Sequence, residues 1–146
     1  MKFLVVGLGS MGKRRIRNLH TLGEIIIIGF DPRKDRCIEA EQKYEIKTFQ
    51  NFDEAINTKP DVMIISTPPD LHSKYAKIAI ERKIHFFTEA NVVTDEMIEI
   101  IDLLKNNYNK INSFYIDIPE SFIENIREYN EYYVTKQINT IDFIVD

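Results

Sequence analysis

Three glycines near the amino terminus are spaced to hold a phosphate group. Gly7, Gly9 and Gly12 follow the pattern G-x-G-x-x-G, directly after an apolar run over residues 2–6 and at the start of a helix-like stretch over residues 11–22. The first glycine permits a tight turn, the second lets the backbone approach a pyrophosphate, and the third lets the helix pack near the strand. Because unpaired N–H groups and the helix dipole attract phosphates, the pattern predicts a dinucleotide site.

An acidic residue follows at the distance that such a site requires. Asp31 comes directly after a second apolar run, over residues 25–30, and lies 19 positions after Gly12. A carboxylate there accepts hydrogen bonds from the adenosine ribose and repels a 2′-phosphate, which favours NAD over NADP. Arg33 and Lys34 lie just beyond and can receive a 2′-phosphate, so NADP stays open as the cofactor.

The elements that must position these residues alternate along the chain. Short apolar runs separated by helical periodicity predict a parallel sheet covered on both faces. Right-handed crossovers then give an α/β Rossmann fold, a doubly wound sheet in a three-layer α/β/α arrangement. The predicted strands are residues 2–7, 25–30, 46–49, 61–66, 84–88 and 111–116. The predicted helices are residues 11–22, 33–43, 51–59, 72–82 and 94–108.

The last quarter of the chain departs from this alternation. We expect a dinucleotide-binding domain over residues 1–118 and a further helix and strand over residues 119–146. The last strand either closes an edge of the sheet or begins a truncated substrate domain. In the second case Ile141, Phe143 and Val145 leave an apolar edge uncovered, which predicts pairing of two chains into a homodimer.

Composition narrows the classes of function. A length of 146 residues with 44% hydrophobic residues suits one globular domain, and the net charge of −4 gives no electrostatic support for nucleic-acid binding. No apolar run approaches membrane-spanning length, and no signal peptide is visible. The single cysteine, Cys37, indicates a reducing, cytoplasmic setting, and we expect it to pack within a helix rather than act as a nucleophile.

The order of these motifs resembles the Gfo/Idh/MocA family of oxidoreductases. The resemblance is carried by the glycine loop, by the Phe30–Pro32 segment, by Pro60–His72 with its T-P-x-x-x-H turn, and by Ile84–Glu89. It covers residues 1–110 well and the remainder more loosely. The resemblance implies an N-terminal domain that binds a nicotinamide cofactor and a C-terminal domain that holds a sugar or polyol.

The resemblance also implies contacts at the carboxyl ends of the later strands. Thr67, Pro68 and His72 are expected to line the cofactor, with His72 on the nicotinamide side, and Glu89 is expected near the nicotinamide ribose. A purely structural role fits His72 equally well, because it begins a helix where it can bond a nearby backbone group. No metal site is predicted. The predicted cofactor contacts are Gly7, Gly9, Ser10, Met11, Gly12, Asp31, Arg33, Thr67, Pro68, His72 and Glu89.

Two departures from the family pattern concern catalysis. The family's E-K-P triplet reads Glu89–Asn91 here, so Ala90 replaces the lysine, and Lys83 lies at the wrong end of its strand to substitute for it. The chain holds three histidines, which are His20, His72 and His85. None follows residue 85, where the family's acid/base histidine is expected. Hydride transfer from a sugar hydroxyl carbon needs a proton acceptor, so the catalytic residues stay unassigned.

Three functions follow from these observations. The first is the NAD(P)-binding part of an oxidoreductase that acts on a sugar, polyol or nucleotide-sugar. The second, which Ala90 favours, is a non-catalytic dinucleotide-binding protein such as a sensor, an assembly partner or a pseudoenzyme. The third is a pocket for a nucleotide-sugar in place of NAD. For the 146 residues alone we expect cofactor binding without useful catalysis.

Overall fold

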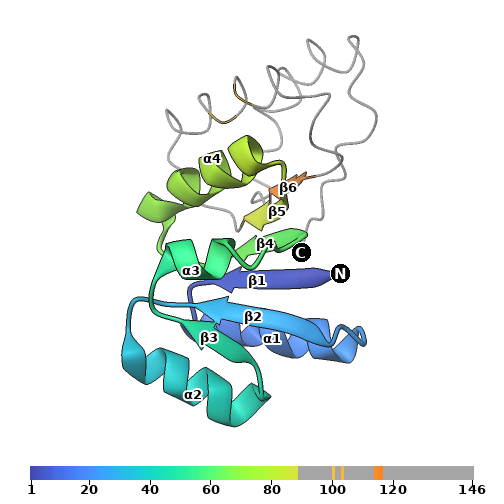
Figure 1. The fold of residues 1–146 in the computed structure, drawn as a ribbon, viewed down its shortest axis with the longest axis vertical. Coiled ribbons are helices and arrows are strands. Elements are labelled where there is room, and N and C mark those ends of the chain that lie inside the picture. The colour runs from blue at the N-terminus through green and yellow to red at the C-terminus, as the bar shows by residue number, and fades with distance from the viewer. Residues whose placement is uncertain (89–99, 101–102, 104–113, 117–146) are drawn as a thin grey trace, which may run out of the picture.

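The described part of the chain forms one sheet in which each pair of neighbouring strands is parallel. The computed structural model describes residues 1–88, 100, 103 and 114–116. The strands lie in the order β3-β2-β1-β4-β5-β6 (Figure 1). They are β1 (Lys2–Val6), β2 (Ile26–Phe30), β3 (Lys47–Phe49), β4 (Val62–Ile65), β5 (His85–Thr88) and β6 (Phe114–Ile116). This order is that of a doubly wound dinucleotide-binding sheet, so the predicted fold class is confirmed.

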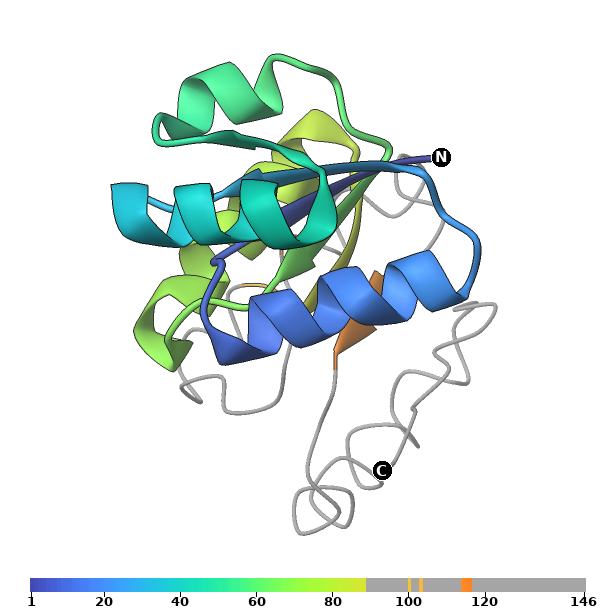
Figure 2. The ribbon, with the colours of Figure 1, turned by 90° about the horizontal axis from the view of Figure 1, so that it is seen from below.

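The helices cover both faces of the sheet. The described helices are α1 (Ser10–Thr21), α2 (Lys34–Tyr44), α3 (Phe52–Ile56) and α4 (His72–Arg82), with a short 3-10 turn η1 (Pro69–Leu71) before the last of them. Side chains from α1 and α2 share one apolar cluster, whereas those from α3 and α4 share another. Figure 2 shows α1 and α3 on opposite sides of the strands. The three-layer arrangement follows from this division.

Successive residues of the central strands belong alternately to the two apolar clusters. Leu4 and Val6 of β1 belong to the cluster beneath α3 and α4, and Phe3 and Val5 belong to the cluster beneath α1 and α2. All four are buried, because side chains along a strand point to opposite faces and both faces are covered here. This burial explains why the strands read as continuous apolar runs rather than as alternating patterns.

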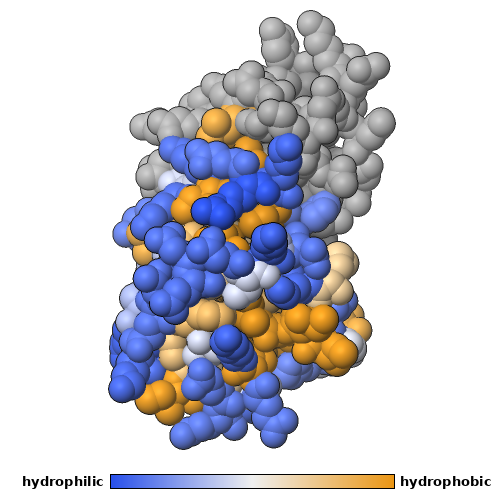
Figure 3. Space-filling view, viewed as in Figure 1, coloured by the Kyte–Doolittle hydropathy of each residue, from blue (hydrophilic) through white to orange (hydrophobic). Residues whose placement is uncertain are grey.

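The second strand begins one residue later than the sequence predicts. Ile25 was expected within the strand, but β2 starts at Ile26, which pairs with Lys2, the first residue of β1. Ile25 therefore lies beyond the covered part of the sheet and is 88% exposed. Figure 3 shows an apolar area on this side of the molecule, toward the starts of β1 and β2. Most of the other predicted boundaries lie within one residue of the observed ones, although α3 ends early, at Ile56.

Several predictions fall outside the described residues. They are the helix and strand over residues 119–146, the contact at Glu89, the apolar edge behind the expected homodimer, and most of the helix over residues 94–108, of which only Ile100 and Leu103 are described, both as helical. These stay predictions, as does the domain division at residue 118.

The packing of α1 against the glycine loop leaves no room for a side chain at Gly12. A β-carbon placed on Gly12 would lie 1.8 Å from the carbonyl oxygen of Gly7. Gly7 itself has a φ of +92°, and its own β-carbon would lie 2.6 Å from the carbonyl oxygen of Ser66. The loop is thus held between the start of α1 and the end of β4 by backbone contacts that only glycine allows.

The run of isoleucines in β2 provides a test of the sheet's register. Ile27 and Ile28 are 4% and 8% exposed and point into opposite clusters, whereas Ile25 is 88% exposed. We expect Ile27→Ala and Ile28→Ala each to lower the free energy of unfolding by about 2–5 kcal/mol. Ile25→Ala, the matched control, should change it by less than about 0.5 kcal/mol. Urea denaturation followed by circular dichroism measures all three, and an equal cost at residues 25 and 27 would contradict the register.

The close approach of α1 to the loop provides a second test. Gly12→Ala should lower the free energy of unfolding by about 3 kcal/mol or more, because backbone must move to admit the methyl group. Gly9→Ala is the control, since its β-carbon would meet only the end of the Arg36 side chain, at 3.7 Å. We expect the control to cost less than about 1 kcal/mol by the same denaturation assay. A Gly12→Ala protein as stable as the control would show that the helix can shift freely.

Candidate functional site

The predicted site residues converge at the carboxyl ends of the central strands. The loop that carries Gly7 leaves β1 between the ends of β2 and β4, and the Gly7 N–H donates to the Phe30 carbonyl oxygen at 2.8 Å. The chain runs outward in both directions from β1, so the boundary between β1 and β4 is the point where the strand order reverses. Ligands of doubly wound sheets bind in the crevice at such a point.

The amino terminus of α1 is open toward this crevice. Gly9 is the N-cap residue, and no side chain caps the helix. The first turn contains no acidic residue, and the first helical bond runs from the Lys13 N–H to the Gly9 carbonyl at 3.0 Å. The N–H groups of Ser10, Met11 and Gly12 therefore precede the first bonded turn, where helix N–H groups and the helix dipole favour an anion.

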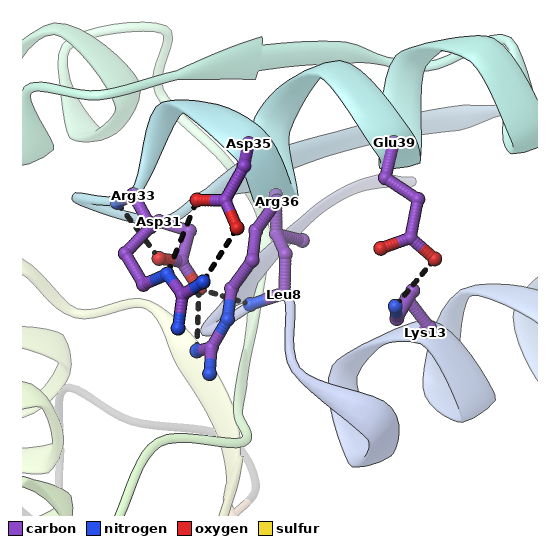
Figure 4. A network of polar contacts seen from close by, with 7 residues as sticks. All are labelled: Leu8, Lys13, Asp31, Arg33, Asp35, Arg36 and Glu39. Atoms are coloured by element: carbon purple, nitrogen blue, oxygen red, sulfur yellow. Dashed lines mark hydrogen bonds and ion pairs between the residues drawn. The ribbon is translucent and has the colours of Figure 1, made fainter.

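Asp31 is a buried carboxylate at the end of β2, with an exposed fraction of 1%. Its Oδ2 accepts from the Leu8 N–H at 2.9 Å, and its Oδ1 accepts from the Arg33 N–H at 2.9 Å (Figure 4). The Arg36 guanidinium also donates to Oδ2, at 3.2 Å. The carboxylate thus joins the glycine loop to the turn between β2 and α2.

The two arginines that flank this carboxylate have different partners (Figure 4). Arg33 forms two hydrogen bonds with Asp35, from Nε at 3.1 Å and from Nη2 at 2.5 Å. These bonds raise the pKa of the Arg33 guanidinium above its ordinary value and lower the pKa of the Asp35 carboxyl. Arg36 instead points toward Asp31 and the glycine loop, with its side chain 37% exposed.

The sequence analysis singled out Arg33 and did not identify Arg36. Arg33 is the N-cap of α2, and Arg36 lies one helical turn further on. A side chain in the first turn of a helix can contact the loop before that helix. Arg36 lies three residues after Arg33, and this i, i+3 spacing could have identified it from the sequence. The structure brings Arg36, and not the Arg33 side chain, onto the Asp31 carboxylate.

The turn after β4 brings the predicted residues Thr67, Pro68 and His72 to the same edge of the sheet. Pro68 is exposed and precedes the 3-10 turn η1, whose chain leads into α4. His72 is 2% exposed, and its Nε2 lies 2.7 Å from the Thr67 carbonyl oxygen. This contact is the backbone bond that the structural role of His72 requires, and it fixes the ring at the head of α4.

Three buried polar atoms at this edge have no hydrogen-bond partner within the described part of the chain. They are Thr67 Oγ1, His72 Nδ1 and Thr88 Oγ1. Thr67 and His72 follow β4, and Thr88 ends β5, so all three belong to the carboxyl ends of neighbouring strands. Buried polar groups without partners are rare in native proteins, and a bound water, ion or ligand can supply the missing bond.

An aromatic group packs under the Asp31 end of the site. The rings of Phe30, Phe52 and Tyr75 pack in edge-on and tilted arrangements, with ring centroids 4.9–6.3 Å apart. Burial, and to a lesser extent the charge of Asp31, raises the pKa of the Tyr75 hydroxyl above its ordinary value. This packing holds the end of β2 and the start of α4 in fixed relation.

The described residues fit a dinucleotide. The loop offers an uncapped helix terminus, and only the Arg36 side chain lies near the β-carbon position of Gly9. The end of β2 offers a carboxylate, and the ends of β4 and β5 offer polar atoms without partners in the described part of the chain. No three His, Cys, Asp or Glu side chains among the described residues are grouped to hold a metal ion. The described helices also include none that is long and apolar enough to cross a membrane.

Solved structures share this architecture. The chain is similar to the WlbA dehydrogenase of Chromobacterium violaceum in complex with NADH and UDP-GlcNAcA, with a TM-score of 0.68 and 14% identity over 95% of this chain and 41% of that chain. It is also similar to myo-inositol 2-dehydrogenase of Lactobacillus plantarum, with a TM-score of 0.69 and 20% identity over 90% and 42%. For UDP-N-acetylglucosamine 3-dehydrogenase of Acidithiobacillus ferrooxidans the TM-score is 0.67, with 18% identity over 94% and 42%. The chain therefore spans less than half the length of these proteins.

A search of curated proteins found no match. The model of one protein family matches residues 1–114, and its description reads oxidoreductase family, NAD-binding Rossmann fold. This match covers most of the chain and includes every described element from β1 to β5. The chain belongs to the Gfo/Idh/MocA oxidoreductase family, and residues 1–114 are its NAD-binding Rossmann domain.

Proposed function

We infer that this chain is the cofactor-binding part of an NAD(P)-dependent oxidoreductase acting on a sugar, polyol or nucleotide-sugar. The observation that carries the proposal is the convergence of the open α1 terminus, the Asp31 carboxylate and three unpaired buried polar atoms at one edge of the sheet. Each of these features suits a different part of one elongated dinucleotide. The family match supports the cofactor class, and the named relatives support the substrate class.

In this proposal the glycine loop holds the pyrophosphate. The N–H groups of Ser10, Met11 and Gly12 face the phosphates, and Gly9 lets the backbone approach them because its β-carbon position is open except for the Arg36 side chain. Asp31 then accepts hydrogen bonds from the adenosine ribose. The Lys13 ammonium is held by Glu39 of α2, which leaves the phosphate charge to the helix terminus.

The nicotinamide half lies along the ends of β4 and β5. Thr67, Pro68 and His72 line this side. Thr67 Oγ1 and His72 Nδ1 have no partner within the described residues, and in this proposal they bond the ribose or the carboxamide once the side chains that cover them move aside. Thr88 Oγ1 supplies a third such atom, and Glu89 follows it directly in the sequence. A bound nicotinamide supplies the hydride acceptor or donor, while these side chains fix its position at the edge of the sheet.

The assignment of substrate depends on the relatives rather than on a residue of this chain. The named relatives include dehydrogenases of inositol and of UDP-N-acetylglucosamine, and one holds NADH with UDP-GlcNAcA. Since this chain spans 41–42% of their lengths, the proposal assigns it the cofactor-binding role and leaves sugar recognition to residues outside the Rossmann domain. The buried thiol of Cys37, which donates to the Asp31 carbonyl oxygen and forms no disulfide, agrees with a reducing, cytoplasmic setting.

One observation favours a second function, a non-catalytic dinucleotide-binding protein. Ala90 stands where the family's E-K-P lysine is expected. A site built this way holds the cofactor but offers no matched proton acceptor for a substrate hydroxyl. A sensor or assembly partner needs the binding alone.

Cofactor titration tests the binding part of the proposal. Saturable NADH binding is expected from the rise in nicotinamide fluorescence, which no tryptophan of this chain complicates. Gly9→Ala should weaken NADH binding by about tenfold or more, because its methyl group holds the pyrophosphate away from the backbone. Gly23→Ala is the control at the far end of α1: its φ of +83° makes the alanine cost stability, but a β-carbon there meets nothing within 4 Å and lies away from the glycine loop, so NADH binding should not change. Absence of NADH binding by the wild-type chain would overturn the proposed function.

Turnover assays separate the two functions. The 146-residue protein, with NAD⁺ and either myo-inositol or UDP-N-acetylglucosamine, should form no NADH at a useful rate, because it lacks a matched proton acceptor. The same assay is then run on the longest protein that its gene encodes. Steady NADH formation there supports the oxidoreductase, and binding without turnover of either compound supports the non-catalytic alternative. Robust turnover by the 146 residues alone would show that the chain contains an acid/base group that we have not assigned.

A further inference from the structure

One side chain lies across the adenosine end of the site in a position that bears on the choice of cofactor. Arg36 reaches from the first turn of α2 to Asp31, with Nη1 3.2 Å from Oδ2 (Figure 4). The same guanidinium lies over Gly9, because a β-carbon placed there would be 3.7 Å from Nη1 and 3.9 Å from Cζ. Arg36 thus bridges the glycine loop and the carboxylate expected to bind ribose.

The hydrogen-bonding capacity of Asp31 is largely used. A carboxylate offers about four acceptor positions, two on each oxygen. The Leu8 N–H and Arg36 occupy Oδ2, and the Arg33 N–H takes one position of Oδ1. Two of these donors are backbone groups that the fold fixes in place, so one position remains while Arg36 is bound. Asp31 therefore cannot accept both hydroxyls of an unphosphorylated ribose unless Arg36 leaves it.

The charges point the same way. An isolated Asp31 carboxylate repels a 2′-phosphate, but the ion pair with Arg36 compensates its negative charge. A guanidinium has five N–H donors, and within the described residues Arg36 uses one of them, toward Asp31. The Arg36 side chain is 37% exposed, and its guanidinium lies against the carboxylate at which we place the ribose, so the remaining donors are close to the expected 2′-substituent. A guanidinium fork suits phosphate oxygens particularly well.

Arg33 is a weaker candidate for this task. Its Nε and Nη2 donate to Asp35, and the pair lies on the exposed surface of the α2 start. Arg33 contacts Asp31 only through its backbone N–H. Its side chain therefore has a competing partner, whereas the Arg36 guanidinium has no side-chain partner other than Asp31 within the described residues.

We propose that Arg36 sets the cofactor preference of this domain: by neutralising Asp31 and offering its guanidinium to a 2′-phosphate, it makes the site accept NADPH as well as NADH. This inference rests on the proposed function, since it requires that the adenosine lie at Asp31. Arg36 is a specificity residue in this scheme and takes no part in hydride transfer.

The test compares the Kd of NADPH with the Kd of NADH, by nicotinamide fluorescence, in the wild type and in variants of the 146-residue protein. Arg36→Ala should raise the Kd of NADPH by about tenfold or more, since a charge-assisted hydrogen bond to phosphate is lost, and change the Kd of NADH by less than about threefold. Arg36→Lys keeps the charge but loses the fork, so NADPH should bind with intermediate affinity. Lys43→Ala is the matched control, because it removes an exposed positive charge from the last turn of the same helix.

Displacement of bound NADH by adenosine nucleotides tests whether Arg36 acts on the 2′-phosphate of the cofactor. Adenosine 2′,5′-bisphosphate should displace NADH less well from Arg36→Ala than from the wild type, whereas 5′-AMP should act equally on both. An equal loss of NADH and NADPH binding in Arg36→Ala, or a shift in preference caused by Arg33→Ala instead, would overturn the inference. Binding of neither cofactor to the wild type would overturn the proposed function itself, so the two failures are distinguishable.

Discussion

The buried carboxylate of Asp31 is the interaction on which the candidate site depends. Its two oxygens accept backbone N–H bonds from Leu8 and Arg33, so a single side chain joins the loop after β1 to the turn after β2. A charge that is 1% exposed is tolerated because it is hydrogen-bonded on both oxygens and paired with Arg36. The carboxylate therefore has a structural role in connecting these two loops. A ribose hydroxyl can bond only to the acceptor position of Asp31 that these donors leave open.

The fold places the remaining elements around this joint with little tolerance. Gly12 brings the start of α1 against the Gly7 carbonyl, and Gly7 in turn lies against the end of β4. As a result the helix terminus, the carboxylate and the β4 turn are fixed relative to one another before a ligand binds. Pre-organisation of this kind reduces the ordering cost of binding. The two apolar clusters, one on each face of the sheet, support this arrangement.

Much of this architecture could be predicted from the sequence. The first strand, the glycine pattern, the helix and the acidic residue each indicate a dinucleotide-binding fold, and together they predict one sheet with a known strand order. The prediction was less successful where the outcome depended on side-chain direction. Arg33 and Arg36 are equally basic in the sequence, but only the helix geometry of α2 shows that one meets Asp35 and the other meets Asp31. Likewise, the ring of His72 bonds the Thr67 carbonyl because the 3-10 turn reverses the chain there, which the residue types alone do not reveal. The sequence predicts that β2 starts at Ile25 because residues 25–28 are all isoleucine. Pairing with β1 decides which of these isoleucines are buried in the sheet.

The buried polar atoms at the ends of β4 and β5 that have no partner in the described part of the chain have a thermodynamic consequence. A buried polar group left without a hydrogen bond costs about 1 kcal/mol or more, so Thr67, His72 and Thr88 make the ligand-free domain less stable than its packing would otherwise allow. A compound that supplies the missing bonds binds the folded state alone and raises the melting temperature through linkage. The melting temperature of the domain can therefore be used to identify its ligand. In a screen of dinucleotides and nucleotide-sugars, compounds that bond these three atoms should raise the melting temperature more than fragments that bind the glycine loop alone.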